Sequence, residues 1–143
     1  MRAPDVARIV ATPAAPRGNA SGPFPYSQAV VVGGLVFVSG QGPFDPETGA
    51  IVGSTIQEQT RQAMRNVEAI LVAAGSSLER VASVQFLLTS PEDFAGFNEE
   101  WTRWFPHDPP ARSGARHPLA VPDLRISITV VAETGSAAQD ATA

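Results

Sequence analysis

Apolar and polar positions follow each other along the chain at spacings that predict a small set of strands and helices. Residues 29–39, AVVVGGLVFVS, are two β-branched apolar runs on either side of Gly33 and Gly34. Glycine accepts the positive φ of a tight turn, so this segment predicts two adjacent antiparallel strands. Residues 44–53 carry Asp-Pro and Thr-Gly pairs, which predict a turn-rich loop after the hairpin.

The clearest helix is predicted over Thr55 to Ala74. Thr55 and Glu58 have the spacing of a capping box, and Gly75 stands where helices often end in a left-handed residue. The apolar residues recur at helical spacing and form one stripe: Ile56, Ala63, Val67, Ile70 and Ala74. One face of this helix is therefore expected to pack against a sheet.

The second half of the chain predicts a strand, a helix and two further strands. Val81 to Leu88 reads as a strand, and Ser90-Pro91 opens a helix because proline suits the first helical position. Its apolar side would be lined by Phe94, Phe97, Trp101 and Trp104 or Phe105. The last extended segments are Ala111 to Leu119 and Leu124 to Glu133.

The last strand predicts which side chains face the core. Leu124, Ile126, Ile128 and Val130 alternate with a second set on the opposite face, which is Arg125, Ser127, Thr129 and Val131. The order of elements predicts an α+β fold, a two-layer sandwich in which two helices cover one face of a mixed, mainly antiparallel sheet. The other face of so apolar a sheet is expected to lie against another subunit.

Composition bounds the class of protein and removes several kinds of chemistry. The 143 residues suit one domain, expected over 1–134, with a flexible tail over 135–143. The absence of cysteine and lysine excludes thiolate nucleophiles and Schiff-base lysines. A net charge of −4 with scattered arginines argues against nucleic acid as a partner. No apolar run predicts a membrane span or export signal, so we expect a cytoplasmic protein.

Familiar catalytic and cofactor motifs are missing. His107 and His117 match no metal-ligand spacing, and the segment VSGQG around Ser39 lacks the nucleophile elbow of serine hydrolases. The glycines of the hairpin do not form a dinucleotide-binding fingerprint. We therefore expect neither a metal nor a cofactor.

One arginine stands out by its surroundings. Arg112 lies in PPARSG, where Pro110 and Gly114 restrict and expose the backbone, so its guanidinium could be held as a fork for a carboxylate. The same pattern also fits an intersubunit or surface salt bridge. Tyr26, the single tyrosine, lies in the proline-held segment PFPYSQ and could either orient a ligand or fill an interface.

Several stretches together resemble the YjgF/RidA family, also known as L-PSP endoribonucleases. The resemblance covers residues 25–132 and is carried by PYSQAV (25–30), VFVSGQGPFDPETGAIV (36–52), QTRQAMRNVEAILVAAGSSLERV (59–81), EDFAGFNEEW (92–101) and PARS (110–113). It implies a fold like that of trimeric chorismate mutase and a homotrimer with clefts between subunits. It also implies cofactor-free hydrolysis of 2-imino or 2-enamino acids to keto acids and ammonia.

The resemblance assigns roles to particular residues. Arg112 corresponds to the arginine that grips the substrate carboxylate, so carboxylate binding becomes the favoured interpretation. Tyr26 would wall and orient the ligand, Asn98 would contact or support the site, and three residues of the hairpin strand would line the cleft: Ser39, Gly40 and Gln41. For Gly40 and Asn98 a purely structural role is an equal alternative.

The chain departs from the family pattern at two places. Gly114 stands where archetypal imine deaminases carry a cysteine, so only backbone groups could act there. Ser127 stands where they carry a glutamate that holds or activates water, and Thr129 stands at the second acidic position. No shift of register by two residues restores an acid on that face.

The resulting hypothesis is a homotrimer that hydrolyses a small imino or enamino acid, with Arg112, Tyr26 and Ser127 as catalytic candidates. A pathway-specific relative could instead hydrolyse, tautomerise or cyclise another substrate, with Ser127 and Thr129 as hydrogen-bond donors. A non-catalytic, metabolite-binding or chaperone-like module is the third possibility. RNA cleavage is disfavoured by the net charge and by the lack of lysine and of a histidine pair.

Overall fold

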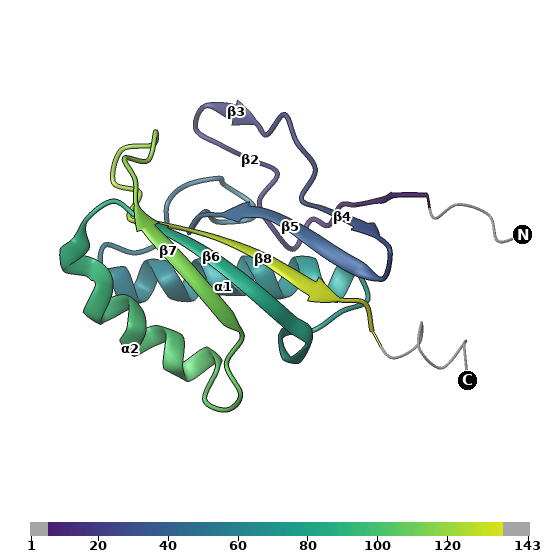
Figure 1. Ribbon diagram of the computed structural model, residues 1–143. Coiled ribbons are helices and arrows are strands. Elements are labelled where there is room, and N and C mark those ends of the chain that lie inside the picture. Colours follow the sequence, from purple (N-terminus) through teal and green to yellow (C-terminus); the bar gives the residue numbers. More distant parts are fainter. Residues whose placement is uncertain (1–5, 136–143) are drawn as a thin grey trace, which may run out of the picture.

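The chain forms a six-stranded sheet with two helices packed on one face (Figure 1). The computed structural model describes residues 6–135. The helices are α1 (Ile56–Ala73) and α2 (Phe94–Trp104), with 3-10 turns η1 (Leu78–Arg80) and η2 (Pro91–Asp93). The strands are β1 (Arg8–Val10), β2 (Gly18–Asn19), β3 (Gly22–Pro23), β4 (Ala29–Val32), β5 (Leu35–Gln41), β6 (Val81–Leu88), β7 (Ala111–Arg116) and β8 (Ile126–Glu133). The α+β sandwich expected from the sequence is confirmed.

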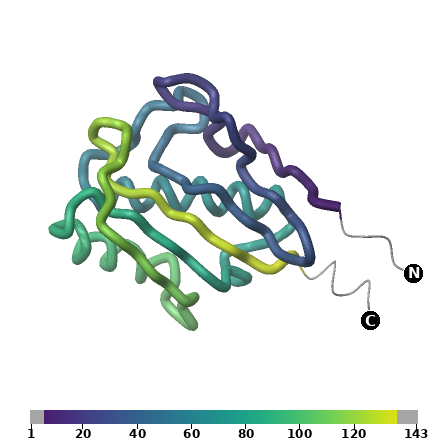
Figure 2. The backbone as a smooth tube through the Cα atoms, turned by 45° about the horizontal axis from the view of Figure 1, so that its top comes forward, coloured from purple at the N-terminus to yellow at the C-terminus, as the bar shows by residue number. Residues whose placement is uncertain are grey.

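The strand order of the main sheet is β1-β4-β5-β8-β6-β7, and β2 and β3 form a separate small hairpin. All neighbours in the main sheet are antiparallel except β6 and β7, which are joined through α2 and run parallel. The last strand, β8, runs between β5 and β6 in both backbone views (Figures 1 and 2). It therefore joins the two halves of the chain.

Local sequence signals produce the first half as expected. Gly33 and Gly34 take φ values of +60° and +76° in the turn between β4 and β5. The Thr55 hydroxyl accepts the Glu58 N–H at 3.1 Å, and the Glu58 carboxylate accepts the Thr55 N–H at 3.1 Å. Both halves of the capping box are thus present, and α1 ends before Gly75, whose φ is +81°.

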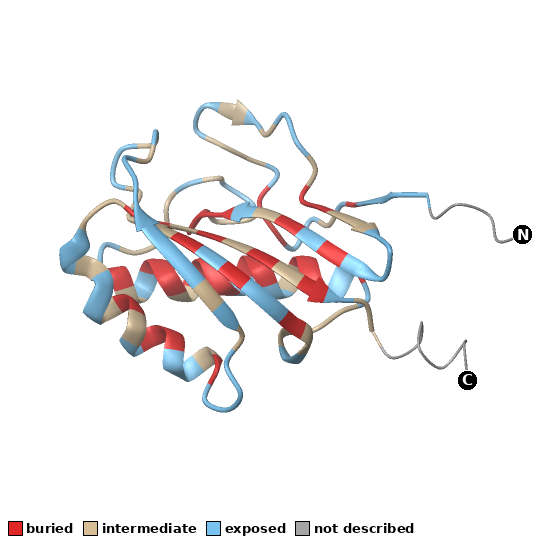
Figure 3. Ribbon diagram, in the orientation of Figure 1, coloured by how far each residue is buried: buried red, intermediate tan, exposed pale blue. Residues whose placement is uncertain are grey.

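The core lies between the sheet and the helices. Side chains along β5, β6 and β8 alternate between buried and more exposed positions (Figure 3). The buried face of β8 carries Ile126, Ile128, Val130 and Ala132, none more than 1% exposed, which confirms the alternation expected for this strand. A 2.7 Å ion pair between Arg61 and the buried Glu100 joins α1 to α2.

A bulge interrupts the pairing of β5 with β8. Val38 pairs with Val130, and the next pair along the two strands is Gln41 with Ile128, so β5 holds one extra residue at Ser39 and Gly40. A bulge turns the side chains on either side of it and strengthens the local twist. It brings the buried Gln41 onto the core face of the strand and leaves Gly40 exposed.

Some boundaries differ from the sequence expectations. The segment expected as extended to Leu119 leaves the sheet after Arg116, and β8 begins at Ile126 instead of Leu124. Pro118 and Pro122 lie in the intervening loop, where they have no N–H to offer a ladder. The expected tail over 135–143 lies, apart from Gly135, outside the described residues.

Candidate functional site

Arg112 lies on edge strand β7, on the face that the helices cover. It pairs in register with Val84 of β6, whose side chain is 1% exposed and belongs to the core. In a parallel pair, residues in register point to the same side of the sheet. The Arg112 side chain therefore enters the space between β7 and α2 and does not extend into open solvent.

Four aromatic rings surround the Arg112 guanidinium. Its Cζ lies 5.0 Å from the Phe86 ring centroid, and the other three rings come from α2: Phe94 at 5.8 Å, Phe97 at 5.2 Å and Trp101 at 5.1 Å. These distances are within the range of cation–π attraction. We call this arrangement the aromatic box, defined by Phe86, Phe94, Phe97 and Trp101.

The aromatic box holds the cation without neutralising it. Within residues 6–135, no carboxylate lies within ion-pair distance of Arg112 and no hydrogen bond from its guanidinium is made. Partial burial lowers the pKa of Arg112 by desolvation. A partly desolvated fork of N–H donors with no internal acceptor suits a planar anion such as a carboxylate.

Gly114 has the shape that the aromatic box requires. It is the register partner of Phe86, and a Cβ built on Gly114 would overlap the Phe86 ring. The ring therefore occupies the space that a side chain at position 114 would need. With glycine there, residue 114 has no side chain that could contact a ligand. Only the Gly114 backbone remains at this part of the site.

Asn98 lies on α2, between the turns that carry Phe94 and Trp101. Its Oδ1 is buried and accepts no hydrogen bond from the residues that the structure describes. A buried amide oxygen without a donor is destabilising unless a ligand or water satisfies it. This position fits the supporting role expected for Asn98 as well as direct contact with a ligand.

Ser127, Thr129 and Gly40 form a second group of expected site residues. A Cβ built on Gly40 would lie 2.9 Å from the Ser127 Oγ and 3.4 Å from the Thr129 Oγ1. Both hydroxyls lie on the half-exposed face of β8, beside the bulge of β5. They could hold a water molecule above the Gly40 backbone, but the adjacent positions of this face, Arg125 and Val131, carry no carboxylate.

Tyr26, Ser39 and Gln41 form a third group on the N-terminal side of the sheet. The Ser39 hydroxyl donates to the Ser27 carbonyl at 2.6 Å, and the Gln41 amide donates to the Ser39 carbonyl at 3.1 Å. Tyr26 is 52% exposed and stacks on Phe24, with ring centroids 5.2 Å apart. Tyr26 and Gln41 line a cavity of about 230 Å³, and desolvation raises the pKa of the Tyr26 hydroxyl.

A single chain does not bring these groups together. The sheet separates Arg112, on the helix face, from Ser127 and Thr129, on the opposite face, and β6 lies between their strands. The opposite face also exposes large apolar side chains of β4 and β5, namely Val32, Leu35 and Phe37, between 36% and 44%. Such a surface favours contact with another protein.

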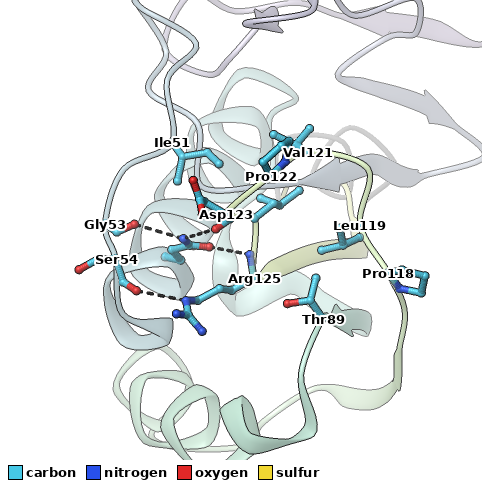
Figure 4. A pocket seen from close by; sticks show the side chains of 12 residues that line it. Ile51, Gly53, Ser54, Thr89, Pro118, Leu119, Val121, Pro122, Asp123 and Arg125 are labelled. Carbon is cyan, nitrogen blue, oxygen red and sulfur yellow. Dashed lines mark hydrogen bonds between the residues drawn. The ribbon is translucent and has the colours of Figure 1, made fainter.

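A different arginine lines a cavity of about 740 Å³ at the end of β8 (Figure 4). Arg125 pairs with Asp93 at 3.2 Å and donates to the Ser54 carbonyl at 3.1 Å. Gln59 bonds to Gly53, Asp123 and Arg125 across the same cavity. None of the expected site residues lines it, and the Arg125 guanidinium is already paired with Asp93.

The loop that carries His107 and Asp108 also lies apart from the hydroxyl pair, which is Ser127 and Thr129. His107 and Asp108 line a cavity of about 420 Å³ with Leu78, Glu79 and Trp104, at the C-terminal end of α2. His117 follows the opposite end of β7. The loop therefore places no base on the face of β8 that carries Ser127.

The aromatic box is the part of the site that sequence reasoning missed. Phe94, Phe97 and Trp101 were expected to line the apolar side of the second helix, and Phe97 and Trp101 are indeed buried. Phe94 is 45% exposed, and its ring lies beside the Arg112 guanidinium. The alternation of the sixth strand could have placed Phe86 on the core face, but not beside Arg112, since the parallel register is set by the fold.

Comparison with known proteins identifies relatives over most of the chain. Residues 18–134 match the family model described as Endoribonuclease L-PSP. A RutC family protein of Saccharolobus solfataricus is 42% identical over 109 residues, which are 76% of this chain and 86% of that protein.

Solved structures agree with the fold. The crystal structure of TdcF from E. coli with bound serine has a TM-score of 0.80 and 34% identity, covering 90% of this chain and 99% of that one. RidA from the Antarctic bacterium Psychrobacter sp. PAMC 21119 has a TM-score of 0.79 and 34% identity, covering 88% and 98%. No helix within residues 6–135 is long and apolar enough to cross a membrane.

Proposed function

Because the chain belongs to the YjgF/RidA family, we propose that it hydrolyses a small 2-imino or 2-enamino acid to the 2-keto acid and ammonia. Arg112 anchors the substrate carboxylate in this proposal. The observation that carries it is the aromatic box, which holds a guanidinium that has no acidic partner within the described residues. TdcF binds serine, whose α-carboxylate is the same chemical group.

The reaction needs a carboxylate anchor, one water and a path for a proton. Water adds to C2 of the protonated imine, and the C=N bond becomes the C–N bond of a carbinolamine. Cleavage of that C–N bond releases the nitrogen as ammonium and leaves the carbonyl of the keto acid. Both protons of the water end on the nitrogen, one on addition and one as the C–N bond breaks, so the overall reaction has no net proton demand.

Ser127 and Thr129 are proposed to position this water. Their hydroxyls both lie close to the Gly40 backbone, where they can accept from water and donate to the carbinolamine. A hydroxyl is a weak base at neutral pH, and general-base assistance commonly contributes about 10²- to 10⁴-fold. We therefore expect turnover that is slower than an enzyme with a glutamate at this position would reach.

The complete site is proposed to form between subunits of a homotrimer. Arg112 and the hydroxyl pair lie on opposite faces of one sheet, so a second copy must bring its hydroxyl pair to the first copy's aromatic box. The exposed apolar face of β4 and β5 supports this assembly, because contact with another subunit would bury it. Tyr26 would then approach the ligand from the same neighbouring copy.

The test generates 2-iminopropionate from alanine with an amino-acid oxidase and traps surviving imine as its semicarbazone. Catalytic amounts of the protein should reduce the trapped signal, and Arg112→Ala should lower kcat/KM by about 10- to 100-fold, as loss of charged hydrogen bonds predicts. Arg125→Ala removes an equal charge from the other arginine site and should retain activity within about threefold. Equal losses in both variants would contradict the assignment of Arg112.

A binding module without turnover is the alternative outcome. In that case the wild type would leave the trapped signal unchanged. Pyruvate keeps the carboxylate and carries a carbonyl in place of the imine, so it would still bind. Arg112→Ala would weaken this binding. The absence of a carboxylate beside Ser127 and Thr129 is the observation that favours this second candidate. The trapping assay separates the two, and calorimetric titration with pyruvate tests whether the binding module exists.

A further inference from the structure

A second, apolar cavity adjoins the Arg112 site. It has a volume of about 350 Å³ and is lined by Phe86, Leu88, Pro91, Phe94, Gly114, Ala115 and Arg116. Two of these residues, Phe86 and Phe94, also belong to the aromatic box, where their ring centroids lie 6.1 Å apart. Phe86 and Phe94 thus border both the cavity and the Arg112 guanidinium.

The register of β7 aligns the guanidinium with this cavity. Arg112, Gly114 and Arg116 are alternate residues that pair with Val84, Phe86 and Leu88, so all three lie on the helix face. Alternate residues of a strand are roughly 6.6 Å apart, about the distance from a carboxylate to the middle of a medium-sized amino-acid side chain. The Phe86 ring covers Gly114 on this face, so a molecule held by Arg112 can reach the cavity only past the rings of Phe86 and Phe94, which border both.

Gly114 keeps the floor of this cavity apolar. Because residue 114 has no side chain, the Phe86 ring forms the floor there, and no polar side-chain atom comes from this position. Leu88, Pro91, Phe94 and Ala115 form the walls, and Arg116 is the one charged residue of the lining. An apolar group would lose its hydration on entering, whereas a hydroxylated or cationic group would find few partners.

We propose that this cavity receives the side chain of the substrate, and that the substrate is a 2-imino acid with a bulky apolar side chain, branched aliphatic or aromatic. This inference rests on the proposed function, in which Arg112 holds the carboxylate. A methyl side chain would leave most of the cavity empty, while an isobutyl or benzyl group would contact Phe86 and Phe94. Each buried methylene contributes about fourfold to relative affinity.

The experiment compares imines made from alanine, leucine and phenylalanine with the full-length wild-type protein. The leucine-derived and phenylalanine-derived imines should exceed the alanine-derived imine by at least about 10-fold in kcat/KM. Phe94→Ala should reduce this ratio by about fivefold or more, and Phe94→Leu should restore part of it. Val72→Ala is the matched control, because Val72 is an exposed apolar residue of α1 that does not line the cavity.

Each outcome separates the two proposals. Equal rates for all three imines would overturn the side-chain cavity and leave imine hydrolysis standing. If no imine is hydrolysed, calorimetric titration with pyruvate, 4-methyl-2-oxopentanoate and phenylpyruvate still tests whether the cavity receives an apolar side chain. Tighter binding of the two bulky keto acids, weakened by Phe94→Ala, would support the cavity without catalysis, and equal or absent binding would overturn it.

Discussion

Arg112 and Arg125 are two arginines beside cavities, and their surroundings differ in one decisive respect. Arg125 is neutralised by Asp93 and bonds to the Ser54 carbonyl at the start of α1. Arg112 is surrounded by aromatic rings and meets no carboxylate of the described chain. Both guanidiniums are fixed in place, but only one has its charge balanced by the protein itself.

Under the proposed function, the unbalanced charge of Arg112 marks the ligand site and the larger cavity does not. The cavity at Arg125 is about 740 Å³, about twice the 350 Å³ cavity beside Arg112. Its polar groups nevertheless bond to one another and fasten the loop before β8 to the N-terminus of α1. We therefore expect substitutions at Arg125 to change stability and substitutions at Arg112 to change ligand binding.

The largest expected effect on stability is at Gly114, next to Arg112. Gly114→Ala would force a methyl group into the Phe86 ring, and such overpacking costs about 1 to 3 kcal/mol of unfolding free energy. Chemical denaturation followed by tryptophan fluorescence measures this loss. Phe86→Leu in the same chain should recover most of it, and Ser113→Ala, on the other face of the strand, should have little effect. A Gly114→Ala protein as stable as the wild type would show that the aromatic box adapts.

An intermediate effect is expected on the Arg125 side, at the capping box of α1. Thr55→Ala removes the hydroxyl that accepts the Glu58 N–H and should cost about 1 kcal/mol. The pKa of Glu58 is held below its usual value, first by the hydrogen bond from the Thr55 hydroxyl and then by those from the N–H groups of Thr55 and Ser54.

The pH dependence of this capping contribution has a definite sign. Because the pKa of Glu58 is lower in the folded protein, the stabilisation is present above the unfolded-state pKa and disappears as pH falls through the folded-state pKa. The stability difference between wild type and Thr55→Ala should therefore shrink on acidification below about pH 4. A difference that grows on acidification would contradict this account.

The smallest expected effect comes from exchanging each arginine for methionine. Arg125→Met breaks the pair with Asp93 and should cost about 0.2 to 1 kcal/mol, since the arginine side chain is 43% exposed. Arg112→Met keeps an unbranched chain against the rings. The lost cation–π attraction is offset by removal of a desolvated charge, so its unfolding free energy should stay within about 0.5 kcal/mol of the wild type. Denaturant titration of both variants in one buffer compares them, and the reverse ranking would contradict the contrast between the two arginines.

Much of the fold could be predicted from local patterns. The glycine pair of the hairpin, the Thr55 capping box and the alternation of the last strand each appear where the sequence placed them. Arg112 was also singled out from its local sequence. The aromatic box could not be predicted, because it depends on the parallel register that places Phe86 beside Gly114. The separation of Arg112 from Ser127 by the sheet likewise depends on strand order, which residue spacing does not encode.

The central position of β8 has a consequence for how the molecule is made. The strands β1, β4 and β5 form one group and β6 and β7 another, and within residues 6–135 only β8, the last strand of that range, bonds to both groups. Long-range pairings of this kind close slowly, because the chain between them must be ordered first. The sheet therefore closes only after residue 133 has been synthesised, and the exposed edges of β5 and β6 need protection from aggregation until then.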